Sequence, residues 1–239
     1  MESSLEPFLD SGWITEVIGV MKSGKEATVY CCRGGRPARA NLVAAKIYRP
    51  LEERGFRNDA QYWDGYVITS GRARRGFENK SKFGREVQFA LWVGREYETL
   101  RTLHAAGADV PRPIHQSGDG MLMEFVGTLD EPAANLNKIK LPEKDAPQLY
   151  EKLMDNIVLW LSLNRVHGDL SPYNILHWRG ELTVIDFPQA TDPRTNRNAF
   201  DLLRRDIENV YDYFRHCGVR DDSFARAARI WSRFLRAEL

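Results

Sequence analysis

The chain has 239 residues, of which 43% are hydrophobic and 28% are charged, with a formal net charge of +1 at pH 7. This length is sufficient for a sizeable core in one domain or in two closely packed lobes. The near-zero charge gives no electrostatic argument for binding nucleic acid or a membrane. The three cysteines fit neither a disulfide framework nor a zinc site, and no apolar run reaches the roughly eighteen residues of a membrane span. The acidic start is not a secretory signal. We therefore expect a cytoplasmic protein.

The first half of the chain predicts three short strands followed by a long helix. The segments "WITEVIGVM", "TVYCC" and "LVAAKIYR", within residues 13–49, are rich in β-branched and aromatic residues and are separated by glycine-containing turns. Residues 50–81 are polar, basic and aromatic, which predicts a long exposed insertion. The segment "GRARRGFENKSKFGR", at its end, is either a solvated basic loop or a surface for RNA or an acidic protein. Residues 82–106 show helical spacing of apolar residues.

The second half predicts more helix. "VPRPI" interrupts the chain, "MLMEFV" predicts a buried strand, and residues 127–145 form a connector. A helix is expected over 146–164, two short strands around "WRGE", and two amphipathic helices near the C-terminus, separated by glycine. This order predicts an α+β fold with two lobes, and a cleft between lobes is a common place for a ligand.

Three oxygen-bearing side chains cluster in "RVHGDLSPYNILHWRGELTVIDFPQAT", residues 165–191. Asn174 follows Asp169 by five positions, and Asp186 ends the apolar run "LTVI". A carboxylate at the end of a buried strand is costly unless it binds something, and magnesium prefers oxygen ligands. The alternative, in which Asp169 and Asn174 only cap a turn, accounts for each alone but not for all three.

Lys46 ends the apolar run "LVAA", so its ammonium is expected to emerge from a buried strand. Glu96 in the long helix could pair with it, although helical glutamates are commonly solvated and Glu98 lies nearby. Phosphoryl transfer from ATP requires a lysine on the phosphates, an acid that holds it, oxygen ligands for magnesium and a carboxylate at the acceptor hydroxyl. The chain offers a candidate for each. The spacing D-x4-N, followed by an apolar strand ending in "ID", matches the catalytic signature of protein kinases. His167 is expected to be a packed residue that holds the turn.

Several stretches indicate which family of kinases the sequence resembles. They are "SGKEATVY" at 23–30, "AAKIYR" at 44–49, "REYETLRTLHAAGADVPRPI" at 95–114, "MEFVG" at 123–127, and "VHGDLSPYNIL" with "VIDFPQA" within 166–190. With these motifs the sequence resembles the RIO family of atypical serine/threonine protein kinases over nearly its whole length. The most specific feature is "IDFPQ", which replaces the Asp-Phe-Gly of common kinases. "IDFPQ" and "GKEATVY" point to different RIO subfamilies, which leaves the subfamily and any ribosome-assembly role open.

The resemblance implies a single RIO-type kinase domain over 1–239, with a two-lobed protein-kinase-like fold. The N-lobe would cover 13–126, with 50–81 as a flexible insertion near the ATP site. The C-lobe, 127–239, would be reduced and helical, without an activation segment or peptide-binding helices. The implied site consists of a phosphate-covering loop (Ser23, Lys25, Glu26), the phosphate-binding Lys46 with its partner Glu96, hinge residues Glu124 and Val126 at the adenine, the catalytic Asp169, and the metal ligands Asn174 and Asp186 for Mg²⁺ or Mn²⁺.

The implied activity is ATP-dependent phosphorylation of an unidentified protein and of the chain itself. A second hypothesis is an ATPase switch, which hydrolyses ATP through an acyl-phosphate on Asp186 and binds a partner according to its nucleotide state. A third is a small-molecule kinase, because antibiotic and choline kinases share a similar "HGD…N" turn, although "IDFPQ" and "SGKEA" argue against it. A fourth, a scaffold with an inactive site, conflicts with the complete set of candidate residues.

Overall fold

A computed structural model describes residues 4–49 and 82–239, with side chains in the long helix described from Val93 onward. The predicted insertion at 50–81 lies outside the described residues, and so does most of the basic segment that ends it. The chain separates into two compact units. The first comprises the described part of Met1–Glu98 together with Arg112–Phe125, and the second comprises Thr99–Pro111 and Val126–Leu239. The assignment of a single kinase domain over 1–239, with lobes 13–126 and 127–239, stays a prediction.

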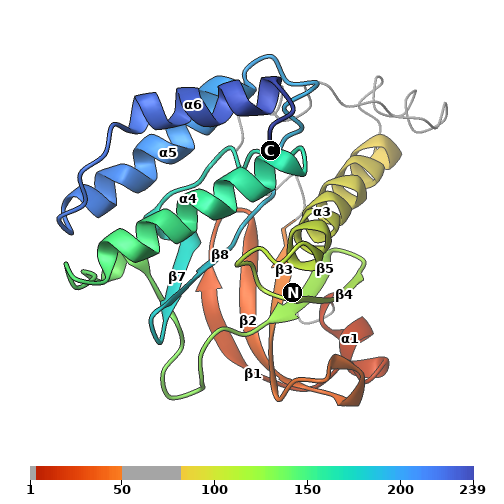
Figure 1. Ribbon diagram of the computed structural model, residues 1–239. Helices are drawn as coiled ribbons and strands as arrows, with labels where there is room; N and C mark the ends of the chain where they lie inside the picture. Colours follow the sequence, from red (N-terminus) through yellow and green to blue (C-terminus); the bar gives the residue numbers. More distant parts are fainter. Residues whose placement is uncertain (1–3, 50–81) are drawn as a thin grey trace. The chain divides into compact units, whose positions relative to one another are not determined.

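An antiparallel five-stranded sheet of order β1-β2-β3-β5-β4 builds the first unit (Figure 1). Its elements are α1 (Glu6–Asp10), β1 (Ile14–Ser23), β2 (Ala27–Gly34), β3 (Leu42–Tyr48), β4 (Pro113–Ser117), β5 (Gly120–Glu124) and the beginning of α3 (Lys82–Ala105). The central strand β3 places Lys46 opposite Val29 of β2 on one side and Met121 of β5 on the other. Lys46 is therefore fixed by ladders on both sides, which limits the movement of its backbone.

The helix α1 was not predicted, and the strand β4 was implied only by the family resemblance of residues 95–114, not by the residue pattern. The helix α1 has a proline in its first turn and buries Phe8 completely against the sheet. "VPRPI" was interpreted as an interruption, yet Pro113 begins strand β4. The sheet order explains why proline is tolerated there, since β4 lies at the edge and its first residue needs no hydrogen-bonded partner on the outer side.

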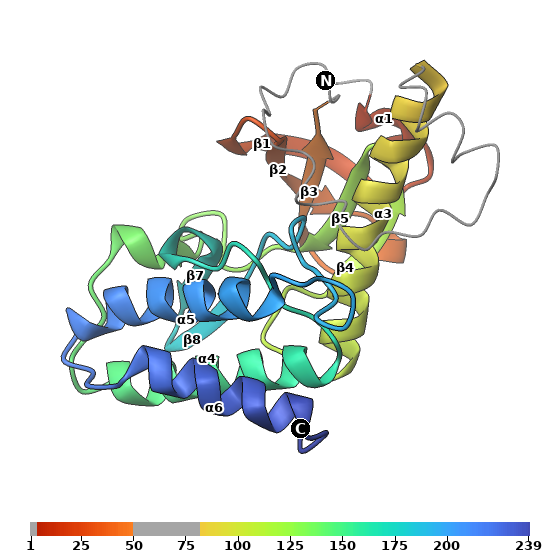
Figure 2. The same ribbon diagram turned by 90° about the horizontal axis from the view of Figure 1, so that it is seen from above.

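The second unit combines a small sheet with three helices. Its elements are β6 (Ala134–Asn135), α4 (Ala146–Ser162), β7 (Ile175–Trp178), β8 (Glu181–Val184), α5 (Ala199–Arg215) and α6 (Ser223–Leu235). The strands are ordered β6-β7-β8, and α4, α5 and α6 lie side by side (Figure 2). The predicted helices and the strand pair are present, whereas the two-residue β6 in the connector was not predicted. The apolar face of α4 is buried throughout, at Leu149, Leu153, Ile157, Trp160 and Leu161.

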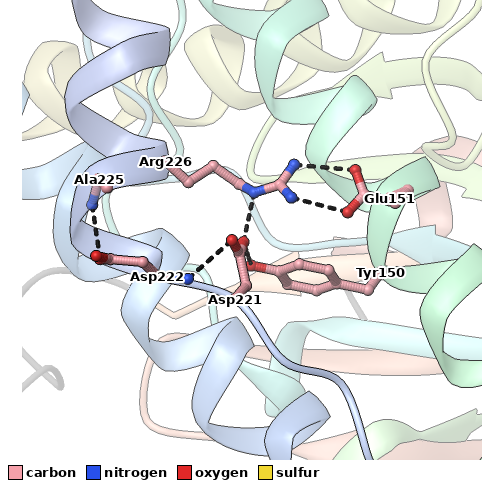
Figure 3. Close-up of polar contacts among 6 residues, drawn as sticks. All are labelled: Tyr150, Glu151, Asp221, Asp222, Ala225 and Arg226. Carbon is pink, nitrogen blue, oxygen red and sulfur yellow. Dashed lines mark hydrogen bonds and ion pairs between the residues drawn. The ribbon is translucent and has the colours of Figure 1, made fainter.

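A polar cluster attaches the start of α6 to α4 (Figure 3). Arg226 donates to both carboxylate oxygens of Glu151 at 2.9 and 2.8 Å, and its Nε also contacts Asp221. The Tyr150 hydroxyl donates to the same Asp221 carboxylate at 2.8 Å. Burial raises the pKa of Asp221, but the hydrogen bonds from Tyr150 and Arg226 outweigh this effect and hold the pKa below its ordinary value. The carboxylate therefore stays ionised and anchors the helix. Across residues 4–49 and 82–239, no helix is long and apolar enough to cross a bilayer.

Candidate active site

A buried ion pair joins β3 to α3 within the first unit. The Nζ atom of Lys46 lies 2.7 Å from Oε1 and 3.0 Å from Oε2 of Glu96. The side chains of Lys46 and Glu96 are only 8% and 0% exposed, whereas Glu98 is exposed. The predicted pairing of Lys46 with Glu96 is therefore present, and Glu98, being exposed, is not part of this buried pair. Burying both charges costs solvation energy, so the pair needs close contacts of this kind to persist.

The three predicted phosphate-loop residues lie at the turn between β1 and β2. Ser23 ends β1, where its hydroxyl accepts a hydrogen bond of 2.9 Å from Arg49 Nη2. The backbone carbonyl of Glu26 accepts from the Arg49 amide at 2.8 Å, and the Lys25 side chain is exposed. Arg49 thus fastens both sides of the turn while leaving the lysine at its tip to solvent. The contact of this turn with nucleotide stays a prediction.

The two predicted hinge residues lie at the end of β5 and just after it. Glu124 ends the strand, and its amide and carboxylate are both engaged by Arg112, through bonds of 2.9 and 3.1 Å. In the second unit, the Val126 carbonyl accepts from the Ala133 amide at 3.0 Å. Contact with adenine stays a prediction for both residues.

In the second unit, Asp169, Asn174 and Asp186 are brought together by a turn and a strand pair. The Asn174 Nδ2 donates to the Asp169 carbonyl at 2.9 Å, which closes the turn. The ladder of β7 and β8 extends one step further, because the Ile185 amide donates to the Asn174 carbonyl at 2.9 Å. Asp186 follows directly, with a φ of 74°, a left-handed conformation that is uncommon for residues other than glycine. Such backbone outliers are concentrated at functional sites.

The negative charges of Asp169 and Asp186 act on each other. Burial is the largest cause that raises the pKa of Asp169, and the negative charge of Asp186 raises it further, while Arg205 lowers it. Gly168, before Asp169, has a φ of 83°, and a Cβ atom there would lie 2.9 Å from the Gln189 carbonyl oxygen. Only glycine fits this position without displacing the segment that follows Asp186.

His167 packs as the sequence predicted. It is buried, and its ring packs against those of Trp160 and Phe187, with centroids 6.2 and 4.5 Å away. Its Nε2 lies 3.3 Å from the Ile185 carbonyl, and its Nδ1 faces the Asp169 amide at 3.3 Å. The histidine therefore links the segment before Asp169 to the segment before Asp186, which is a structural role.

Helix α5 supplies side chains that hold the turn around Asp169. Sequence reasoning did not identify these side chains. Both carboxyl oxygens of Asp206 accept backbone hydrogen bonds of 2.8 Å, one from Gly168 and one from Leu170. Arg205 donates to the Gly168 carbonyl at 2.7 Å, and Asn209 donates to the Leu170 carbonyl at 3.1 Å. Burial raises the pKa of Asp206 to about 7, although the two backbone N–H groups and Arg205 act in the opposite direction. The three side chains hold the residues on both sides of Asp169.

A buried lysine–glutamate pair on a five-stranded sheet, together with a D-x4-N turn and an aspartate after a strand pair, defines the class of protein-kinase-like phosphotransferases. Comparison with known proteins narrows the class. The profile of the RIO domain family matches residues 28–227, and the chain belongs to this family.

Several sequence relatives agree with this assignment. The RIO-type serine/threonine-protein kinase Rio1 of Haloferax volcanii is 34% identical over 92% of this chain and 70% of its own length. The serine/threonine-protein kinases RIO1 of Caenorhabditis elegans and Homo sapiens are 32% and 31% identical. The chain matches only 39% and 35% of the length of those two relatives.

Solved structures agree on the fold. The Rio2 kinase of Chaetomium thermophilum has a TM-score of 0.64 and 20% identity, and covers 98% of this chain and 70% of that one. Its ADP/Mg²⁺-phosphoaspartate complex has a TM-score of 0.62 and 18% identity, and covers 98% of this chain and 74% of that one. These neighbours support the predicted kinase-like α+β fold.

Proposed function

We propose that this protein is an ATP-dependent serine/threonine protein kinase of RIO type, which transfers the γ-phosphate of ATP to a protein hydroxyl and also phosphorylates itself. The observation that carries the proposal is the joined geometry of Asp169, Asn174 and Asp186, in which one carboxylate and one amide belong to a closed turn and the second carboxylate follows the adjoining strand pair. Family membership and the names of the relatives support the same activity.

The donor set fits a magnesium or manganese ion. The amide nitrogen of Asn174 is used by the Asp169 carbonyl, so that its oxygen is the end left for a cation. Asp186 adds a carboxylate, and hard divalent cations combine such oxygen ligands with substrate phosphate oxygens. We assign Asn174 and Asp186 to this ion, which would neutralise charge on the phosphates.

The remaining residues act directly on substrate in this proposal. Lys46, held by Glu96, binds phosphate oxygens of ATP. Asp169 orients the acceptor hydroxyl and accepts its proton, for which the Gly168–Leu170 backbone is fixed by α5. Ser23, Lys25 and Glu26 cover the phosphates, and backbone groups of Glu124 and Val126 meet the adenine.

The partners are then ATP and a protein with an acceptor hydroxyl, and the identity of that protein is not assigned. Contact of the basic segment at 71–85 with RNA or a ribosomal partner stays a prediction, and so does a cytoplasmic location.

The test is to incubate the full chain with ATP labelled on its γ-phosphate, magnesium and a panel of protein substrates, with an aminoglycoside and choline in parallel reactions, and to separate labelled protein, labelled small molecule and free phosphate. Label on the chain or on an added protein is the expected result, and it should disappear in an Asp169→Ala variant. Release of free phosphate alone would replace this proposal with the ATPase switch. Label on an added aminoglycoside or choline alone would replace it with a small-molecule kinase.

A further inference from the structure

Tyr48 lies two residues after Lys46 on β3, so both side chains leave the same face of the strand. The phenol is almost completely buried, with 1% of the residue exposed. Its hydroxyl donates to Oε2 of Glu96 and lies 3.7 Å from the sulfur atom of Met121. Its ring centroid lies 5.0 Å from Lys46 Nζ. Tyr48 thus contacts both members of the buried ion pair.

The hydrogen bonds that Lys46 and Glu96 can form indicate what the contact with Tyr48 does. A lysine ammonium has three N–H donors, and Lys46 uses two of them on the two oxygens of Glu96, at 2.7 and 3.0 Å. When the ammonium turns toward a phosphate oxygen, the longer bond to Oε2 is the one it gives up most easily. A buried carboxylate oxygen that loses a donor is costly. The Tyr48 hydroxyl already donates to Oε2.

We propose that Tyr48 is a positioning residue for phosphoryl transfer. Its hydroxyl holds Glu96 by Oε2, so that Lys46 can turn toward the phosphates of ATP while keeping its bond to Oε1. The inference rests on the proposed role of Lys46, and it adds a third member to the lysine–glutamate pair. The spacing K-x-Y on one strand provides the geometry, because alternate residues of a strand share a face.

Tyr48→Phe tests the proposal because it removes the hydroxyl and keeps the ring. Loss of a hydrogen bond to a charged group corresponds to roughly a tenfold change or more in an equilibrium constant. We therefore expect Tyr48→Phe to raise the KM for ATP and the dissociation constant of ATP–magnesium by about tenfold, with a smaller change in kcat. The matched control is Tyr30→Phe, since Tyr30 is a buried tyrosine on the neighbouring strand β2, opposite Ala45. It should leave both constants unchanged.

A double-mutant cycle separates positioning from packing. If Tyr48 acts through Glu96, adding Tyr48→Phe to Glu96→Gln should have little further effect on ATP affinity. An equal loss in both backgrounds, or affinity within about twofold of wild type for Tyr48→Phe alone, would overturn the inference, given the size expected for such a hydrogen bond.

The Lys46→Met variant separates a failure of the role proposed for Tyr48 from a failure of the role proposed for Lys46. If it weakens ATP binding while Tyr48→Phe does not, only the role of Tyr48 fails. If Lys46→Met has no effect on binding, the proposed role of Lys46 fails with it. Unfolding midpoints verify that each variant is folded at the assay temperature.

Discussion

Replacement of Asp206 by asparagine tests whether α5 positions the turn that carries Asp169. The two carboxyl oxygens of Asp206 each accept one backbone N–H, from Gly168 and from Leu170, at 2.8 Å. An asparagine has a single acceptor oxygen, and its amide nitrogen would face the other N–H group. In either orientation of the amide, one backbone donor loses its partner.

The magnitude follows from the burial of this contact. An unsatisfied buried donor costs about 1–3 kcal/mol, and the variant creates one on the backbone and one on the side chain. We expect the free energy of unfolding to fall by about 2–6 kcal/mol. The turn that loses a bond carries Asp169, and a displacement of about 1 Å at a reacting group can lower the rate about a hundredfold. ATP affinity should change little, because Asp206 holds the acceptor side of the site.

Three measurements on the same preparation check this expectation: urea unfolding, kcat for phosphate transfer, and ATP–magnesium affinity by calorimetry. Asp212→Asn is the matched control, because Asp212 is on the same helix and its side chain is 65% exposed. If Asp206→Asn unfolds like the control and keeps a kcat within about twofold of wild type, against the hundredfold expected, the claim that α5 positions Asp169 is wrong. A loss of stability with unchanged kcat in the folded protein would leave only a structural role.

Other variants test the remaining assignments. Asp169→Ala should lower the transfer rate by about a thousandfold while ATP affinity stays within a few fold, because general-base loss acts mainly in the transition state; a comparable loss of affinity would make Asp169 a ligand instead. Calorimetry should show much weaker ATP binding in EDTA than in magnesium, and equal affinity would contradict the roles of Asn174 and Asp186. Arg226→Ala should lower the free energy of unfolding by about 1–2 kcal/mol, whereas the exposed Arg229→Ala should not. Because the pKa of Asp221 is depressed in the folded protein, its contribution is present above its ordinary pKa and should be lost as the pH falls through the lowered value; a penalty for Arg226→Ala that is constant down to acid pH would contradict this pairing.

The parts of the site that could be predicted from the sequence are those whose chemistry is local. Asp169 and Asn174 lie five residues apart, so one turn joins them, and the bond from Asn174 Nδ2 to the Asp169 carbonyl shows how. Asp186 follows a strand that pairs with the strand after Asn174, and a tight hairpin fixes that neighbour relation as well. Lys46 was recognisable because a charged residue stood in an apolar run. Its partner was less certain, because Glu96 and Glu98 are equally plausible on sequence alone and only packing separates them.

The residues that hold the site in place, Asp206 and Tyr48, were missed because their roles depend on contacts between residues far apart in the sequence. Asp206 lies on an amphipathic helix among many charged residues, and nothing in its neighbourhood marks it as buried. It becomes an anchor only when α5 packs beneath Gly168 and Leu170, 38 and 36 positions away in sequence. Tyr48 had a signal, because it shares a strand face with Lys46, but an aromatic residue at a strand end is also typical of a core position. In the structure Tyr48 has both properties. It is buried like a core residue, and its hydroxyl donates a hydrogen bond to the carboxylate that holds Lys46. Residues that hold a catalytic group can therefore resemble ordinary core or surface residues, and their polar contacts are what distinguish them.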